Sequence, residues 1–203
     1  MNKIKDYKSE GLLIVLSGPS GAGKGTVCKE LLSRNDYWLS VSATTRKPRN
    51  GEVEGASYFF MEKEDFTNKV EEGCFFEYAE VYGNYYGTPK DKIVAKLKAG
   101  QSVILEIDIQ GALQVKEVFE EGIFIFILPP SMEELKNRII GRGSETEESL
   151  NTRFKSAYKE LNYVSKYNYA VVNDYVETAV KKIECIIEAE KCRVDRIKDS
   201  IIK

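Results

Sequence analysis

The residues best suited to chemistry form the glycine-rich segment Gly18-Pro19-Ser20-Gly21-Ala22-Gly23-Lys24-Gly25-Thr26, which follows the apolar run Leu12–Leu16. Its glycines allow successive backbone N–H groups to point at one anion, and a following helix adds the positive end of its dipole. Lys24 then lies where the β- or γ-phosphate of a nucleotide would be. The spacing Gly, four residues, Gly-Lys after a strand predicts a phosphate-binding loop, with a plain glycine-rich turn as the alternative.

The position after the lysine departs from the usual form of this motif. It is Gly25, and the hydroxyl follows one place later, at Thr26. In the usual form a Ser or Thr directly after the lysine ligates magnesium. Thr26 is therefore the candidate metal ligand here, either directly or through a water molecule.

Two arginines, Arg46 and Arg49, lie three residues apart beside a threonine pair and a proline. Their planar guanidinium groups could clamp a phosphate. Considered alone, they are explained more simply as two solvated surface arginines, because such side chains are usually exposed. Considered alone, Tyr58 and Tyr86 are likewise interpreted as half-buried aromatic residues of strands.

Carboxylates occupy two further places of interest. Glu106 and Asp108 lie two apart at the end of the apolar segment Val103–Ile107, so their side chains share a face. Magnesium, a nucleobase edge or an ion pair with an arginine could satisfy them. Glu77, within Phe75-Phe76-Glu77-Tyr78, fits a solvent-facing strand residue on alternation alone.

A third group of cations flanks the charged segment Gly141–Glu148. Arg138 and Arg142 are four apart, hence on one helix face, and Arg153 follows in the next helical pattern. A mobile lid that closes these arginines onto phosphates is one interpretation. The alternative is surface ion pairing with Glu134, Glu145 or Glu148.

The composition excludes several classes of function. The 203 residues suit one domain, and 30 basic against 32 acidic residues give a net charge of -2, so no positive field indicates nucleic acid or membrane as a partner. Without histidine, Ser-His-Asp and Cys-His catalysis cannot operate, and the four cysteines show no metal-ligand spacing. A charged N-terminus and short apolar runs predict a cytoplasmic protein.

The elements that must position these residues are predicted from short apolar runs that alternate with helical patterns, as in an α/β fold. The segment Ser42–Lys98 interrupts this alternation and predicts an inserted region of short antiparallel strands followed by a helix. The C-terminal apolar positions predict one long helix. The predicted strands are Leu12–Leu16, Trp38–Val41, Val103–Ile107, Ile123–Leu128 and Tyr169–Val172; the helices are Thr26–Ser33, Gln110–Glu120 and Met132–Ile140; the C-terminal stripe is Val180, Ile183, Ile187, Val194, Ile197 and Ile201.

Over nearly its whole length the chain resembles the guanylate kinase family, P-loop kinases that transfer a phosphoryl group from ATP to GMP. The similarity rests on several ordered motifs rather than on one. These are 18–26, Ser40–Arg49, Gly51–Val53 with Tyr58, Glu77 with Gly83–Thr88, Glu106–Gly111 and Gly141–Thr146.

The resemblance implies a fold and a set of site residues. The fold is a five-stranded parallel core sheet flanked by helices (about 1–41, 99–137 and 154–203), with a mixed α+β GMP-binding subdomain at about 42–98 and a small mobile lid at about 138–153. The ATP-binding set is Ser20, Gly21, Ala22, Gly23, Lys24, Gly25, Thr26 and Asn173; the GMP-binding set is Ser42, Arg46, Arg49, Tyr58, Glu77, Tyr86, Thr88, Glu106 and Asp108; the catalytic set is Lys24, Arg46, Arg138, Arg142 and Arg153.

The same resemblance implies Mg²⁺ as cofactor and a monomer or homodimer. Glu106 stands where aspartate is more frequent in the family. Two other functions remain open at this point: a non-catalytic protein-binding module of the same fold, and a P-loop kinase for another small phosphoacceptor.

Overall fold

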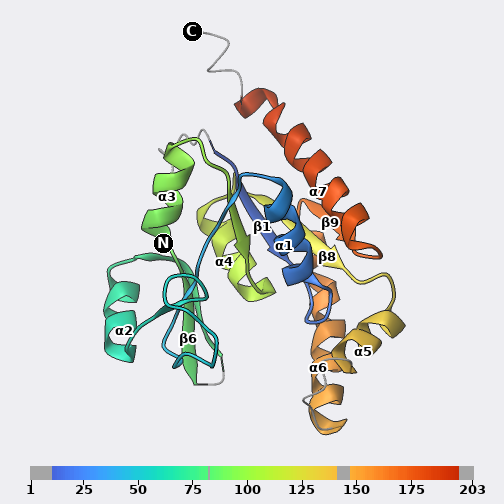
Figure 1. Ribbon diagram of the computed structural model, residues 1–203, viewed down its shortest axis with the longest axis horizontal. Coiled ribbons are helices and arrows are strands. Elements are labelled where there is room, and N and C mark those ends of the chain that lie inside the picture. The colour runs from blue at the N-terminus through green and yellow to red at the C-terminus, as the bar shows by residue number, and fades with distance from the viewer. Residues whose placement is uncertain (1–10, 82, 141–146, 197–203) are drawn as a thin grey trace. The chain divides into compact units, whose positions relative to one another are not determined.

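The computed structural model describes residues 11–81, 83–140 and 147–196. Five parallel strands form one sheet, in the order β2 (Trp38–Leu39), β7 (Val103–Glu106), β1 (Leu13–Ser17), β8 (Ile123–Leu128), β9 (Tyr169–Val172). Four strands form a second sheet, in the order β4 (Phe59–Phe60), β3 (Ala43–Thr44), β6 (Asn84–Pro89), β5 (Phe75–Val81). Figure 1 labels β1, β8 and β9 of the first sheet and β6 of the second. The first sheet confirms the predicted α/β fold with a five-stranded parallel sheet. The described residues group into two compact units, unit 1 (11–13, 37–81, 83–105 and 110–122) and unit 2 (14–36, 106–109, 123–140 and 147–196).

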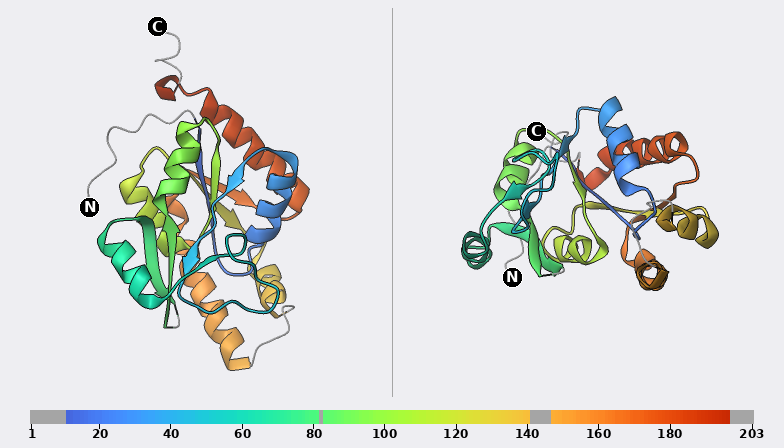
Figure 2. Two further views of the ribbon diagram at one scale, coloured as in Figure 1. Left: turned by 60° about the vertical axis from the view of Figure 1, so that its left-hand side comes forward. Right: turned by 60° about the horizontal axis from the view of Figure 1, so that its bottom comes forward.

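The strands of unit 2 are almost continuously apolar. β1 (Leu13–Ser17) and β8 (Ile123–Leu128) pair in parallel, and β8 pairs in the same way with β9 (Tyr169–Val172). Such strands need cover on both faces, and Figure 2 shows α1 and α7 on one side of them and α6 on the other. The helical segments are α1 (Lys24–Arg34), α5 (Met132–Ile140), α6 (Glu147–Glu160), the 3₁₀ helix η1 (Leu161–Lys166) and α7 (Val176–Lys191).

Helix α7 follows the predicted apolar stripe only in part. Val180, Ile183 and Ile187 are fully buried, on the helix that packs beside α1. The helix ends at Lys191, however, and Val194 is 74% exposed, so the prediction of one helix through this position is wrong. The last two positions of the stripe, 197 and 201, lie outside the described residues.

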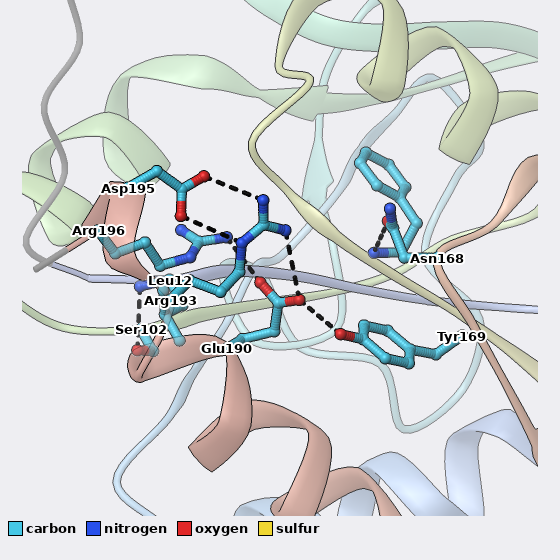
Figure 3. Close-up of polar contacts among 9 residues, drawn as sticks. Leu12, Ser102, Asn168, Tyr169, Glu190, Arg193, Asp195 and Arg196 are labelled. Atoms are coloured by element: carbon cyan, nitrogen blue, oxygen red, sulfur yellow. Dashed lines mark hydrogen bonds and ion pairs between the residues drawn. The ribbon is translucent and has the colours of Figure 1, made fainter.

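A buried carboxylate explains why the chain turns after α7 (Figure 3). Glu190 is 6% exposed; it accepts a hydrogen bond from the Tyr169 hydroxyl at 2.6 Å and one from Arg196 Nη2 at 3.1 Å. Arg193 lies 3.7 Å from the same carboxylate and also pairs with Asp195 at 3.0 Å. In a continuous helix Arg196 would lie about 9 Å further along the axis than Glu190. Because a buried charge must be paired, this cluster favours the turn.

Unit 1 contains the four-stranded sheet and three helices. β6 (Asn84–Pro89) pairs antiparallel with β3 (Ala43–Thr44) and β5 (Phe75–Val81), as expected, but β3 pairs in parallel with β4 (Phe59–Phe60). The inserted region also contains a helix that sequence patterning did not predict between its strands, α2 (Lys63–Glu71). The other elements are β2 (Trp38–Leu39), which pairs in parallel with β7 (Val103–Glu106), α3 (Lys90–Lys98) and α4 (Ile109–Val118).

An aromatic cluster fixes β6 within this unit. The Phe66 ring stacks on Phe75 with centroids 4.6 Å apart and on Tyr85 at 5.5 Å. A Cβ at Gly87 would lie 3.0 Å from Phe66 Cζ, so this close packing needs glycine there. Because strand side chains alternate, the residues on either side of Gly87, Tyr86 and Thr88, share the opposite face.

No helix in the described ranges is long and apolar enough to cross a membrane.

Candidate functional site

The phosphate-binding loop lies between the end of β1 and the start of α1, as predicted. It borders a cavity of about 280 Å³ in unit 2. Two segments far apart in the sequence meet there, because Glu106 and Asp108 also face this space. The lining residues are Gly18, Ser20, Gly21, Gly23, Lys24, Gly25, Glu106, Asp108, Ile109 and Glu160.

Gly23 shows why the loop needs glycine. Its φ is +87°, and a Cβ there would lie 2.4 Å from Asn173 Nδ2. Both the backbone conformation and the contact therefore exclude a larger residue. Asn173 is 3% exposed, and its amide donates to the Ala22 carbonyl at 2.8 Å, which holds the loop against the end of β9.

Lys24 lies over the loop that precedes it. Its Nζ donates to the carbonyls of Gly18 at 2.7 Å and Pro19 at 3.2 Å. The ammonium group is thus held by main-chain oxygens at the border of the cavity. A phosphate oxygen could replace these acceptors with a charge-assisted hydrogen bond.

Arg138 joins α5 to the same loop. Its Nη2 donates to the Asn173 carbonyl at 3.2 Å and its Nη1 to the Ala22 carbonyl at 3.5 Å. Its Nε pairs with Glu134 at 2.8 Å, so the ion pair considered as the alternative is present together with the loop contacts. Arg142 lies outside the described residues, as do positions 141–146 of the predicted lid, and the side chain of Arg153 in α6 is not described.

The space beside Gly25 is occupied by a carboxylate. A Cβ at position 25 would lie 3.3 Å from Glu106 Oε1. Glu106 is exposed toward the cavity, but the protein atoms packed around its carboxyl partly desolvate it and raise its pKa, while the Lys24 charge acts in the opposite direction. Burial also raises the pKa of the neighbouring Cys28 thiol to about 12, with a smaller contribution from Glu106. Any side chain at position 25 would crowd the Glu106 carboxylate, because even its Cβ would lie within close contact.

The donor set around the cavity fits magnesium. This ion is held in nucleotide sites by one or two carboxylates together with phosphate oxygens and water. Glu106 and Asp108 supply carboxylates beside the loop, and Thr26 is exposed in the first turn of α1. Among the described residues no group of three or more His, Cys, Asp or Glu side chains could hold a metal ion.

In unit 1, Arg46 is held by a carboxylate that sequence reasoning did not include among the site residues. Glu52 accepts from Arg46 Nη2 at 2.8 Å and Nη1 at 3.0 Å, and from the Arg49 backbone N–H at 2.7 Å. These bonds hold the pKa of Glu52 below its usual value. The signal for it was the motif Gly51-Glu52-Val53, which contributed only to the family resemblance.

The two tyrosines lie beside Arg46. Its guanidinium carbon is 5.5 Å from the Tyr58 ring centroid, and the Tyr58 and Tyr86 rings meet edge to face at 6.0 Å. The pair with Glu52 and, to a smaller extent, the Tyr86 hydroxyl raise the pKa of the Arg46 guanidinium. The structure thus brings three predicted residues together, whereas Arg49 presents an exposed side chain.

Glu77 is buried, not solvent-facing. Its side chain accepts a hydrogen bond from Thr88 Oγ1 at 2.6 Å, and the two residues are 7% and 1% exposed. This pair joins β5 to the face of β6 that carries Tyr86. Ser42, just before β3, is half-buried, and its carbonyl accepts from the Phe59 N–H at 2.9 Å.

Comparisons with known proteins agree with this geometry. A family model described as guanylate kinase matches residues 10–190. The chain is 75% identical to a guanylate kinase of Clostridium tetani, over 95% of this chain and 93% of that protein. It is 72% identical to one of Clostridium acetobutylicum, over 95% and 92%. A crystal structure of guanylate kinase from Anaplasma phagocytophilum is similar with a TM-score of 0.75 and 37% identity, covering 94% of this chain and 91% of that one.

Proposed function

The chain belongs to the guanylate kinase family, and on this premise we propose how its own residues carry out the reaction of the family. The reaction transfers the γ-phosphoryl group of ATP to GMP and gives ADP and GDP. The nucleophile is an oxygen of the GMP phosphate, which is already anionic, so the absence of histidine is no obstacle.

For ATP, we assign phosphate binding to the loop amides between Ser20 and Thr26. Lys24 would exchange its bonds to the Gly18 and Pro19 carbonyls for bonds to β- and γ-phosphate oxygens. Asn173, which is anchored to the loop, is assigned to the adenine end.

Magnesium would be held by Glu106 and Asp108 with the ATP phosphates, and by Thr26 through water. When bound, the ion neutralises charge on the phosphates. Both acids border the phosphate-loop cavity, which supports a role toward the metal. Their predicted contact with GMP remains a proposal.

For GMP, Arg46 and Arg49 would hold the phosphate, with hydrogen bonds from the hydroxyls of Tyr58 and Tyr86. The bidentate pair with Glu52 fixes the Arg46 guanidinium plane before substrate arrives, which reduces the entropy lost on binding. We therefore assign Glu52 as a positioning residue.

We assign guanine recognition to Glu77 and Thr88, mainly because their side chains form a buried hydrogen-bonded pair. The Watson–Crick edge of guanine presents N1–H and N2–H donors, which a carboxylate can accept. Adenine presents an unprotonated N1 there, whose lone pair would face the carboxylate. Ser42 would add a further polar contact to the base.

During transfer, Arg138, Arg142 and Arg153 would neutralise the migrating phosphoryl group, since positioning and charge supply most of the rate in this chemistry. The described contacts of Arg138 with Ala22 and Asn173 support its place near the ATP phosphates. The lid at 138–153 and the GMP-binding subdomain at 42–98 remain parts of this proposal, as do a cytoplasmic location, a monomeric or homodimeric state and the lack of nucleic-acid partners.

A coupled assay of ADP release with GMP, AMP, CMP and UMP tests the proposal. We expect GMP to be preferred over AMP by about 10⁴-fold in kcat/KM. Glu77→Gln should lower kcat/KM for GMP by about 10²-fold, because the amide presents a donor to a guanine donor. Glu80→Gln, an exposed carboxylate of the same strand, is the matched control. Comparable turnover of all four nucleotides would contradict the proposal.

A further inference from the structure

A second cavity, of about 420 Å³, lies wholly within unit 1. It is framed by β2, the start of β4 and helix α3, and it contains none of the residues assigned above to ATP, GMP or magnesium. Its volume falls within the range of about 300–1,000 Å³ typical of small-molecule sites. The lining residues are Trp38, Val41, Gly55, Phe59, Lys92, Ala95 and Lys96.

The walls combine aromatic rings with positive charge. Lys92 Nζ lies 3.9 Å from the Phe59 ring centroid, and Lys96 Nζ lies 5.9 Å from that of Trp38. Lys96 also donates to Gln101 Oε1 at 2.9 Å, which restrains its head group. Both charged residues of the lining carry the same sign.

We propose that this cavity binds a small planar aromatic anion. A flat ring would stack against Trp38 or Phe59, because offset-stacked and edge-to-face aromatic contacts are favourable. Its anionic group would meet the ammonium groups of Lys92 and Lys96, which now lie over the ring faces, in charge-assisted hydrogen bonds. Charge complementarity and aromatic walls together select this chemical class over a neutral or cationic ring.

The chain itself supplies a local probe of this cavity. Trp38 is its single tryptophan, so the protein has one indole N–H resonance in a ¹H–¹⁵N spectrum. We would titrate the full chain with 1-naphthalenesulfonate and follow this resonance, with ADP and GMP present at saturating concentration to occupy the nucleotide sites. Naphthalene-1-methanol, which has the same rings but no charge, is the ligand control.

The proposal predicts a saturable shift of the Trp38 resonance with the sulfonate and binding at least about tenfold weaker for the neutral alcohol. The double variant Lys92→Gln/Lys96→Gln should weaken sulfonate binding by about tenfold or more. Lys98→Gln, which removes one charge from the same helix outside the cavity, should stay within about twofold.

Three results would overturn the inference. The Trp38 resonance could show no saturable shift with the sulfonate, or the charged and neutral ligands could bind with equal affinity. Sulfonate affinity could also fall equally in Lys98→Gln and in the double variant. The comparison of the two ligands uses the unmodified chain, so it tests the proposed preference for an anion even if the double variant fails to fold.

Discussion

The phosphate loop of unit 2 and the Arg46 region of unit 1 are both assigned to nucleotide phosphates, but they are built differently. In the loop the side chains are fastened to the main chain: Lys24, Asn173 and Arg138 all donate to carbonyl oxygens. Around Arg46 the bidentate contact joins one side chain to another, in the pair with Glu52, and a single bond from Arg46 Nη1 to the Lys47 carbonyl at 2.7 Å adds a main-chain contact.

This contrast has a physical consequence. A site built on the main chain depends on backbone conformation, so a single added carbon can disrupt it. A site built from side-chain pairs keeps its backbone when one partner changes, and the loss falls on the orientation of the other partner. Substitutions in the two regions should therefore differ in which kinetic parameter they change.

The largest effect is expected from Lys24→Met, which removes the cation of the phosphate loop. We expect kcat/KM to fall by about 10³-fold, as for other cations that stabilise phosphoryl transfer. Lys29→Met, on the exposed side of the same helix, should leave the rate within about twofold. The coupled ADP assay measures both, and a small loss for Lys24→Met would contradict the assigned role.

Gly23→Ala tests the dependence on the main chain. The positive φ and the 2.4 Å approach of Asn173 should together destabilise the loop. We expect kcat/KM to fall by about 10²-fold, with a higher KM for ATP. Gly73→Ala is the matched control, because its φ is +69° but nothing lies within 4 Å of its added Cβ. Equal activity losses in the two variants would show that backbone strain alone, not the contact, is responsible.

Glu52→Gln tests the side-chain pair. Losing the charge loosens the Arg46 guanidinium without removing it, so KM for GMP should rise by about tenfold while KM for ATP and the melting temperature change little. Glu54→Gln removes the same charge from the same loop, where Glu54 accepts only from the Phe60 N–H among its described hydrogen bonds. If both variants behave alike, the effect comes from net charge rather than from positioning.

The smallest effect is a pH dependence of stability at Glu106. Because its pKa is raised in the fold, the folded state holds the proton more tightly than the unfolded chain. That contribution to stability is complete below the ordinary pKa of 4.5 and is lost as the pH rises through the folded value. The neutral Glu106→Gln variant avoids this loss.

Urea unfolding of the nucleotide-free protein checks this sign. Relative to the unmodified chain, Glu106→Gln should gain free energy of unfolding as the pH rises from acid to neutral. Glu133→Gln, exposed on α5, should show no such trend. A difference that does not change with pH would contradict the direction given for Glu106.

The fold and the loop could be predicted because their signals are local. The apolar run before Gly18 and the glycine spacing after it specify a strand, a turn and a helix within one continuous segment. The five parallel strands followed from similar runs. The parallel pairing of β3 with β4 could not, because two-residue strands have no periodicity to reveal their partner.

The side-chain pairs were harder to predict for a related reason. Glu52 and Glu77 have no unusual neighbours in the sequence, and alternation placed Glu77 on the solvent side. The approach of Thr88 from the adjoining strand makes Glu77 a buried acceptor, which alternation within β5 does not reveal. The end of α7 was missed similarly, because its apolar spacing continues while the pairing of Glu190 with Arg196 turns the chain away.

The meeting of Gly25 with Glu106 links two features that the sequence presents as separate departures from common patterns. The glycine leaves room for the longer of the two acidic side chains, and the glutamate fills that room. Positions 25 and 106 therefore constitute one steric unit. A hydroxyl introduced at position 25 would be compatible with aspartate at 106 sooner than with glutamate, so the two positions should be exchanged together when this loop is redesigned.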